Sequence, residues 1–177
     1  NSFVRVSDNT KTEIKKILDL GAKGIIVPMI NTALEAKNAI SYATYPPKGQ
    51  RGYALARAQG FGYNLNNYLK VSKNIKIVVQ IETIKAINNL GEILKVKGIY
   101  STLIGPRDLS GSIGKAGDYK NKKFIKALQK YEKLSKQNNV SMGMHVAFPK
   151  TETINKFIKK GYKFVAIGTD MTFLGDT

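Results

Sequence analysis

The sequence predicts an α/β protein with a parallel β-sheet, and two observations lead to this fold class. Six short apolar runs, often rich in β-branched residues, recur along the 177 residues and are typical of strands buried on both faces. Amphipathic helical patterns lie between these runs, with apolar residues three or four positions apart. Such alternation of strand and helix favours parallel strands joined by right-handed crossovers.

Each strand is predicted from an apolar run and each helix from a stretch with helical periodicity. The first helix is expected to stop before Gly21, because glycine commonly follows the last residue of a helix. The predicted strands fall, in chain order, at residues 3–6, 24–29, 75–81, 100–104, 141–146 and 164–168. The predicted helices fall at residues 12–20, 32–43, 83–94, 124–137 and 151–160. The chain therefore repeats strand and helix five times and closes with a sixth strand.

One segment interrupts this rhythm. Residues 45–62 are rich in glycine and proline, but aromatic residues and two arginines punctuate them, unlike a flexible linker. Long loops in compact domains commonly build or cover a binding site. This segment is therefore the predicted lid of the functional site.

Composition narrows the class of protein. We expect one domain over residues 1–177, and the absence of cysteine excludes a disulfide scaffold. No apolar stretch approaches the ~20 residues that span a bilayer, and no signal peptide is recognisable, so the cytoplasm is the expected location. The net charge of +17 is compatible with a protein that binds nucleic acid. Because the lysines are scattered over helix faces without interleaved aromatic residues, no nucleic-acid or membrane partner is expected.

The arginines carry a separate signal. Only four of the 29 basic residues are arginines, namely Arg5, Arg51, Arg57 and Arg107. In a chain that otherwise uses lysine, arginine is expected where its planar fork of donors is needed. We therefore expect all four at or beside the functional edge of the sheet.

Two acidic residues stand where predicted strands end. Glu82 follows the strand at 75–81, and Asp108 follows the strand at 100–104. The carboxyl edge of a parallel sheet is where βα-proteins place their chemistry. Two carboxylates converging there predict a divalent cation held by oxygen ligands. An acid that caps a helix or lies in its first turn occupies the same position, and the sequence leaves both interpretations open.

Seven sequence features occur in an order and spacing typical of one enzyme family. They are Arg5, Asp19, Val27-Pro28-Met29, Tyr45-Pro46-Pro47-x-Gly49-x-Arg51-Gly52, Gln80-Ile81-Glu82-Thr83, Gly105-Pro106-x-Asp108-Leu109-Ser110 and Gly161-x-x-Phe164-Val165-Ala166-Ile167-Gly168-x-Asp170. On these features the chain closely resembles the HpcH/HpaI-type class II pyruvate aldolases, which include 4-hydroxy-2-oxoheptanedioate and 2-dehydro-3-deoxyglucarate aldolases. The resemblance covers essentially the whole chain.

The resemblance implies a (β/α)8 TIM barrel that cleaves or forms a carbon–carbon bond between pyruvate, or another 2-oxo acid, and an aldehyde. It implies a divalent cation, Mg²⁺, Mn²⁺ or Co²⁺, bound by Glu82 and Asp108 and chelated by pyruvate. Members of the family are homo-oligomers, commonly hexamers, so a homo-oligomer is expected here.

The resemblance also assigns roles to individual residues. The expected catalytic residues are Arg5, which stabilises the enolate and the aldehyde oxygen, and Asp19, which orients a histidine and makes it a stronger proton acceptor. The expected substrate-binding residues are Gln80, Gly105, Pro106, Arg107 (through its backbone amide) and Asp108.

The sequence departs from the family pattern in two places. The family's proton-accepting histidine belongs to an Asp-x-Glu-His segment that these residues do not contain. About six βα units are present, matching barrel strands three to eight, so the first two units and the last helix are expected to be absent. The single histidine, His145, does not match that base; it either faces the mouth of the barrel or is an ordinary strand-end histidine. Arg107 stands where the family usually has a small residue.

Two alternatives accompany the aldolase interpretation. One is a CoA-ester lyase of the citryl- or malyl-CoA type, in which similar acidic residues hold Mg²⁺. The other is a catalytically incomplete barrel fragment that lacks the general-base histidine.

Overall fold

The computed structural model describes residues 2–175, and their strands form one parallel sheet whose order follows the chain. The pairing runs β1-β2-β3-β4-β5-β6, and every pair is parallel. The six predicted strands are confirmed within one or two residues at each end. Their bounds are β1 Phe3–Arg5, β2 Gly24–Val27, β3 Lys76–Ile81, β4 Ile99–Ile104, β5 Met142–Val146 and β6 Tyr162–Ile167.

All five predicted helical stretches are helical, and the structure adds shorter helices that the pattern did not indicate. The predicted ones are α1 Lys11–Asp19, α2 Ala33–Ala43, the pair α4 Ile84–Asn88 and α5 Leu90–Leu94, α7 Lys122–Gln137 and α8 Thr151–Lys159. The added ones are the 3₁₀ helix η1 Arg57–Gly62, α3 Leu65–Ser72, α6 Pro106–Gly111 and α9 Asp170–Gly175. These span only six to eight residues, too few to display a clear helical period.

The predicted helix 83–94 is divided at Asn89, whose backbone leaves the helical region at φ −90° and ψ 3°. The side-chain amide of Asn89 donates to the carbonyl oxygen of Asn31 at 2.8 Å. Asparagine competes with the helix for backbone partners, and here its bond to the neighbouring loop accompanies the break.

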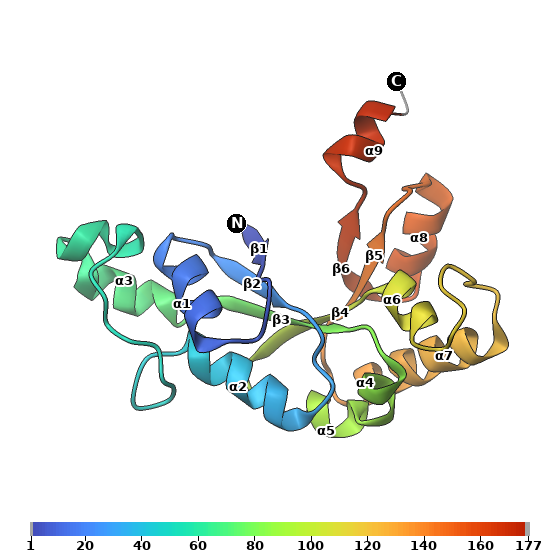
Figure 1. The fold of residues 1–177 in the computed structure, drawn as a ribbon, viewed down its shortest axis with the longest axis horizontal. Helices are drawn as coiled ribbons and strands as arrows, with labels where there is room; N and C mark the ends of the chain where they lie inside the picture. The colour runs from blue at the N-terminus through green and yellow to red at the C-terminus, as the bar shows by residue number, and fades with distance from the viewer. Residues whose placement is uncertain (1, 176–177) are drawn as a thin grey trace.

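The sheet is curved, with its helices along one side. Figure 1 shows α2, α4, α5 and α7 below the sheet, and β5 and β6 rising on the right together with α8. The aromatic ring of Phe3 in β1 lies 5.1 Å from that of Phe164 in β6 and 6.3 Å from that of Tyr100 in β4, centroid to centroid. Side chains of strands that are not neighbours can meet in this way only if the sheet curls around them. The architecture is therefore an open half-barrel.

Alternation along each strand separates the two faces of the sheet. In β3, Ile77, Val79 and Ile81 join the apolar cluster that packs against the helices. Val78 is equally buried but lies outside that cluster, so it belongs to the opposite, concave face together with Gln80. Polar residues on the concave face therefore converge toward the inside of the curve.

A tyrosine of α7 supports the junction between β4 and β5, which is paired at Ile104 with Met144 and at one isolated bridge, Ser101 with Ser141. The hydroxyl of Tyr131 lies 2.6 Å from Oγ1 of Thr102 and accepts a hydrogen bond from the backbone amide of Gly143 at 3.0 Å. Tyr131 is fully buried. It thereby fixes β5 against β4 where few ladder bonds do so.

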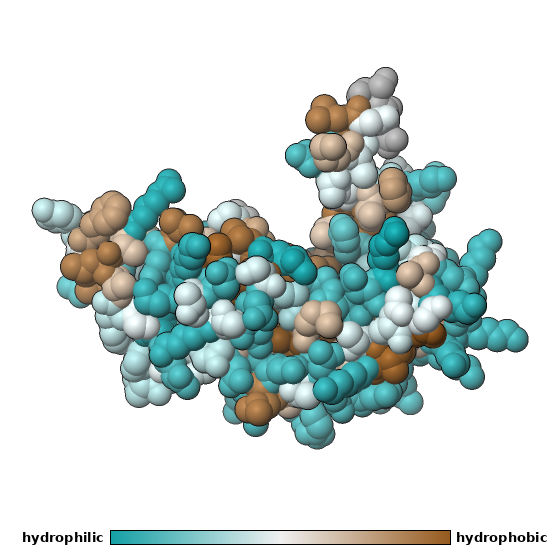
Figure 2. All heavy atoms as spheres, viewed as in Figure 1, coloured by the Kyte–Doolittle hydropathy of each residue, from teal (hydrophilic) through white to brown (hydrophobic). Residues whose placement is uncertain are grey.

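Both ends of the described sheet are open: β1 pairs only with β2, and β6 pairs only with β5. The face of the molecule seen in Figure 2 is mostly polar, and apolar atoms gather on it at the tip formed by η1 and α3. Leu55 and Phe61 at this tip are 64% and 69% exposed. Within residues 2–175, no helix is long and apolar enough to cross a membrane.

Candidate active site

Glu82 follows β3 at the carboxyl edge of the sheet and is almost completely buried, with 3% of its surface exposed. One carboxylate oxygen, Oε1, accepts a hydrogen bond from the backbone amide of Met29 at 2.7 Å. The other, Oε2, accepts one from the side-chain amide of Gln80 at 2.6 Å. Thr83, and not Glu82, caps the helix that follows. The burial of Glu82 is therefore not explained by a capping role.

Asp108 lies in the first turn of α6, directly after β4, and is exposed. Its charge reaches Glu82. Burial raises the pKa of Glu82 above the ordinary value of a glutamate, and repulsion from Asp108 adds to the rise. The hydrogen bond from Met29 and the charge of Arg5 act in the opposite direction. Two carboxylates and a guanidinium therefore share one electrostatic environment at this edge.

Gln80 and Gly105 complete the surroundings of Glu82. Gln80 donates to Glu82, and its carbonyl oxygen Oε1 accepts from Nε of Arg5 at 3.3 Å. A Cβ atom added to Gly105 would stand 2.8 Å from Oε2 of Glu82 and 3.0 Å from Nε2 of Gln80. A side chain at this position would displace Glu82 or Gln80, so the arrangement requires glycine. The structure thus brings together Arg5, Gln80, Glu82, Gly105 and Asp108.

The donor set fits a hard divalent cation. Two interacting carboxylates supply oxygen ligands, and Gly105 gives the buried one the room it occupies at the strand end. Within residues 2–175, no three histidine or acidic side chains are grouped so that they could hold a metal ion. Glu82 and Asp108 would therefore be the ligands from these residues, with the other positions open to substrate and water, as is usual for Mg²⁺.

The raised pKa of Glu82 gives a pH prediction for the metal-free protein. The unfolded chain releases this proton at a lower pH than the folded one, so ionised Glu82 destabilises the fold above the raised pKa. As the pH falls through the folded pKa toward the unfolded value of about 4.3, that destabilisation is relieved. We expect the wild type to gain stability relative to Glu82→Gln over this window, measured by urea unfolding in chelator. A difference between the two proteins that is constant with pH would contradict the prediction.

Pro106 and Arg107 are the first two residues of α6, at the same edge. Proline suits the first helical position because its missing N–H would have no partner there. Arg107 is exposed, and its backbone carbonyl accepts from the hydroxyl of Ser110 at 2.8 Å. In the part of the chain that the structure describes, its guanidinium has no hydrogen-bond or ion-pair partner.

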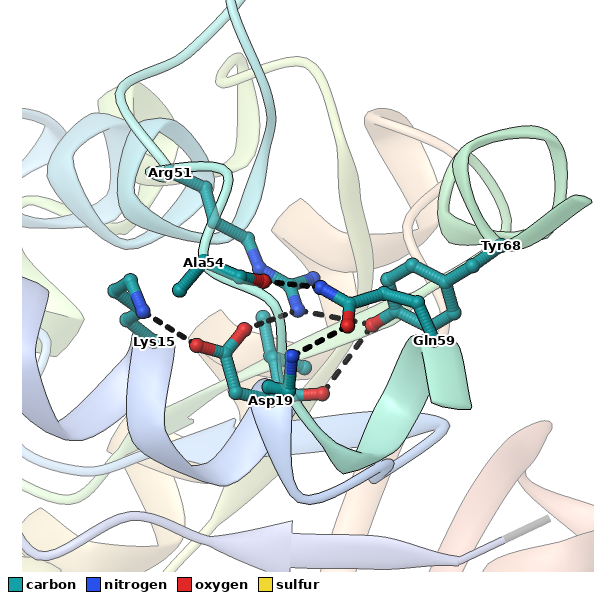
Figure 3. Close-up of polar contacts among 8 residues, drawn as sticks. Lys15, Asp19, Arg51, Ala54, Gln59 and Tyr68 are labelled. Carbon is teal, nitrogen blue, oxygen red and sulfur yellow. Dashed lines mark hydrogen bonds and ion pairs between the residues drawn. The ribbon is translucent and has the colours of Figure 1, made fainter. Parts of the chain in front are cut away.

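Asp19 lies away from this edge. It is the last residue of α1, a helix that starts after the carboxyl end of β1 and runs back toward the beginning of that strand. A helix of nine residues is about 13 Å long, so Asp19 lies near the opposite edge of the sheet. Oδ1 of Asp19 accepts from Nη2 of Arg51 at 2.8 Å, and Oδ2 pairs with Nζ of Lys15 at 2.5 Å (Figure 3). The structure does not bring Asp19 to Glu82 and Asp108, and both of its carboxylate oxygens already have partners.

Arg51 is the centre of this second polar group and is completely buried. Besides Asp19, it donates to the hydroxyl of Tyr68 at 2.9 Å, and that hydroxyl donates to the carbonyl of Leu18 (Figure 3). Its guanidinium carbon stands 4.7 Å from the ring centre of Tyr45. Burial alone would lower the pKa of Arg51, but its bonds to Asp19 and Tyr68 raise it, so the group stays charged.

The expected placement of the four arginines was right for Arg5 and Arg107 and wrong for Arg51 and Arg57. Arg51 fastens segment 45–62 to the end of α1. Arg57 lines a hollow of about 430 Å³ beside the beginning of β1, together with Ser2 and Ala22. Arg51 does make a contact that needs the planar guanidinium, as the scarcity of arginine predicted, but this contact stabilises the fold and does not belong to the site at Glu82.

The chain is similar to proteins of one family. The model of the family described as "HpcH/HpaI aldolase/citrate lyase" matches residues 1–176. A 4-hydroxy-2-oxo-heptane-1,7-dioate aldolase of Escherichia coli is 35% identical over 173 residues, covering 97% of this chain and 65% of the relative. The corresponding protein of Salmonella heidelberg (strain SL476) is 37% identical over 174 residues, with the same coverage. The chain thus spans just under two thirds of the length of these curated relatives.

Solved structures agree with the fold. An HpcH/HpaI aldolase/citrate lyase family protein from Burkholderia cenocepacia J2315 superposes with a TM-score of 0.91 at 26% identity, covering 98% of this chain and 69% of that one. An HpcH/HpaI aldolase from Desulfitobacterium hafniense DCB-2 gives a TM-score of 0.88 at 26% identity, covering 98% and 68%. The half-barrel therefore matches an arrangement already seen in solved structures.

Proposed function

Because this chain belongs to the HpcH/HpaI aldolase/citrate lyase family, we propose that it carries the metal-binding and substrate-binding part of a class II aldolase. The reaction would be cleavage or formation of a carbon–carbon bond between a 2-oxo acid, such as pyruvate, and an aldehyde. One observation carries the proposal. The buried carboxylate of Glu82, whose pKa the charge of Asp108 helps to raise, packs against Gly105 at the carboxyl edge of the sheet, where any larger residue would collide with it.

Glu82 and Asp108 would hold the divalent cation, Mg²⁺, Mn²⁺ or Co²⁺. When bound, the cation supplies a Lewis acid that stabilises negative charge developing on the keto oxygen of the 2-oxo acid. The protein's contribution is to fix Glu82. Its two oxygens are fixed by donors on different strands and loops, Met29 after β2 and Gln80 in β3. The carboxylate is therefore oriented before any ligand arrives.

Arg5 is the proposed donor to a substrate oxygen that gains negative charge. Its Nε is held by Gln80, which leaves the terminal nitrogens for substrate. Fixed donors of this kind commonly contribute ~10²–10³-fold to the rate. Gln80, Gly105, Pro106, the backbone of Arg107 and Asp108 are the proposed substrate-binding residues. A catalytic role for Asp19 stays a prediction from the resemblance.

The open edges of the sheet and the exposed apolar tip at η1 support two further proposals. Exposed edge strands tend to pair with other strands, so we place β1–β6 in a closed (β/α)8 barrel in the full-length protein. Association of several copies, as expected from the resemblance, would then bury apolar groups such as Phe61 and Leu55 at the tip of η1.

The proposed function is tested by assaying the full-length protein for pyruvate release from 4-hydroxy-2-oxo acids. Removal of divalent cations with a chelator is expected to lower the rate by about 10³-fold, since Lewis-acid stabilisation is worth several kcal/mol and each 1.36 kcal/mol is tenfold. Addition of Mg²⁺, Mn²⁺ or Co²⁺ should restore it. Undiminished activity in chelator would contradict the proposed metal dependence. Cleavage of citryl-CoA or malyl-CoA, without cleavage of the 4-hydroxy-2-oxo acids, would favour the CoA-ester lyase.

A further inference from the structure

His145 is the single histidine of the chain and is not among the residues proposed above to bind the metal or the 2-oxo acid. It lies in β5 and is half-buried. Its neighbours on both sides, Met144 and Val146, belong to the core that packs against the helices. Because side chains alternate along a strand, His145 points to the opposite, concave face. Within residues 2–175 its imidazole has no hydrogen-bond partner.

The register of the sheet places His145 level with the proposed metal ligand. Ile81 of β3 is paired with Ile104 of β4, and Ile104 is paired with Met144 of β5. The next residue on each strand is therefore Glu82, Gly105 and His145, side by side in one row. With strands 4.7–4.9 Å apart, the Cα atoms of Glu82 and His145 are about 10 Å from each other.

The middle position of this row has no side chain. Gly105 separates the two residues, and even a Cβ there would collide with the carboxylate of Glu82. The carboxylate of Glu82 packs over this glycine, and the imidazole of His145 stands on the other side of it. A Cα separation of about 10 Å brings His145 within reach of a second molecule bound next to a 2-oxo acid at Glu82.

We propose that His145 binds the aldehyde in the reaction proposed above, donating a hydrogen bond from its imidazole to an oxygen substituent beyond the carbonyl group. The inference rests on the proposed function, because it takes Glu82 and Asp108 as the site of the 2-oxo acid. It makes His145 a specificity-determining residue. An aldehyde with a hydroxyl group next to its carbonyl satisfies the imidazole, whereas an apolar aldehyde leaves this half-buried polar group without a partner.

The test compares two aldehydes of nearly equal size, glycolaldehyde and propanal, which differ by a hydroxyl in place of a methyl group. The full-length wild type, with pyruvate and Mg²⁺, is expected to prefer glycolaldehyde by about tenfold in kcat/KM, since one hydrogen bond is typically worth about 1 kcal/mol and a stranded polar group costs more. His145→Leu is expected to reduce the preference to about one. His145→Gln, which retains an amide donor, should restore part of it.

Tyr100→Leu is the matched control. Tyr100 is also half-exposed and on the concave side, but it packs against Phe3 and Lys76 at the opposite end of the strands. This variant should keep the wild-type preference. Circular dichroism and the urea midpoint of every variant exclude misfolding as the cause of a change.

Results that contradict the role of His145 are distinct from those that contradict the proposed function. A wild type that uses both aldehydes equally, or a His145→Leu variant that slows both by the same factor, overturns the role of His145. The proposed function is checked separately by metal-dependent exchange of the pyruvate methyl protons with deuterated water, which needs no aldehyde. A wild type without that exchange and without aldol activity refutes the proposed function itself.

Discussion

Replacing Glu82 with glutamine is expected to lower metal-dependent carbon–carbon bond cleavage by about 10³-fold, as removal of the cation does. The amide has no charge for a cation. It also has only one acceptor, while both groups that face Glu82, the amide of Met29 and the side chain of Gln80, are donors. The NH₂ group of the glutamine would therefore face a donor unless Gln80 turns its amide and gives up the hydrogen bond from Arg5, and either outcome disturbs the remaining ligand geometry.

The measurement pairs kcat/KM with Mn²⁺ affinity by isothermal titration in the full-length protein. Both should fall together in Glu82→Gln and in Asp108→Asn. The control is Glu92→Gln, which makes the same chemical change in an exposed pair with Lys95 and should leave both quantities unchanged. Wild-type Mn²⁺ affinity in either site variant would mean that the carboxylates at positions 82 and 108 do not share an ion.

Arg51→Leu is expected to destabilise the fold by about 3 kcal/mol, the lower end of what loss of one partner of a buried ion pair costs. The lower end applies because Lys15 still pairs with Asp19. The bond to Tyr68 and the contact with the ring of Tyr45 are lost as well. The effect should appear as a lower urea midpoint at an unchanged m-value.

Two variants control this prediction. Arg57→Leu removes an exposed arginine from the same segment and should change stability by no more than about 0.5 kcal/mol. Arg51→Lys keeps the charge but not the planar fork, so it should fall between wild type and Arg51→Leu. If Arg51→Leu unfolds at the wild-type urea concentration, segment 45–62 is not fastened to α1 by this pair.

Asp19→Asn separates the two roles of Asp19: a structural role lowers the midpoint, whereas a catalytic role lowers kcat at an unchanged midpoint.

Much of the fold could be predicted because its strands are buried on both faces. Continuous apolar runs such as those in β3 and β4 have few alternatives, and the helices between them are long enough to show their period. The helix 83–94 was predicted as one piece because the bond from Asn89 to Asn31 joins residues 58 positions apart. Short helices such as α6 follow from local geometry at a strand end, where periodicity carries no information.

From the apolar pattern alone, without the resemblance, the candidate site was predictable only as a set of strand ends. Strand order within the sheet follows the chain, so Glu82 and Asp108 follow neighbouring strands, as their positions after two consecutive apolar runs indicate. The bonds that orient Glu82 come from Met29 and Gln80, and the first of these is 53 residues away. No local pattern could reveal such a partner.

The sequence by itself determined the α/β class, the positions of the six strands along the chain and the family of the chain, because each depends on local periodicity or on motifs with fixed spacing. Only the tertiary structure decided that Asp19 pairs with Arg51 at the far end of α1 and that His145 stands in one row with Glu82. The physical reason is that strand register and helix direction fix which distant side chains meet. Both arise from packing over the whole sheet, which no single segment of the chain encodes.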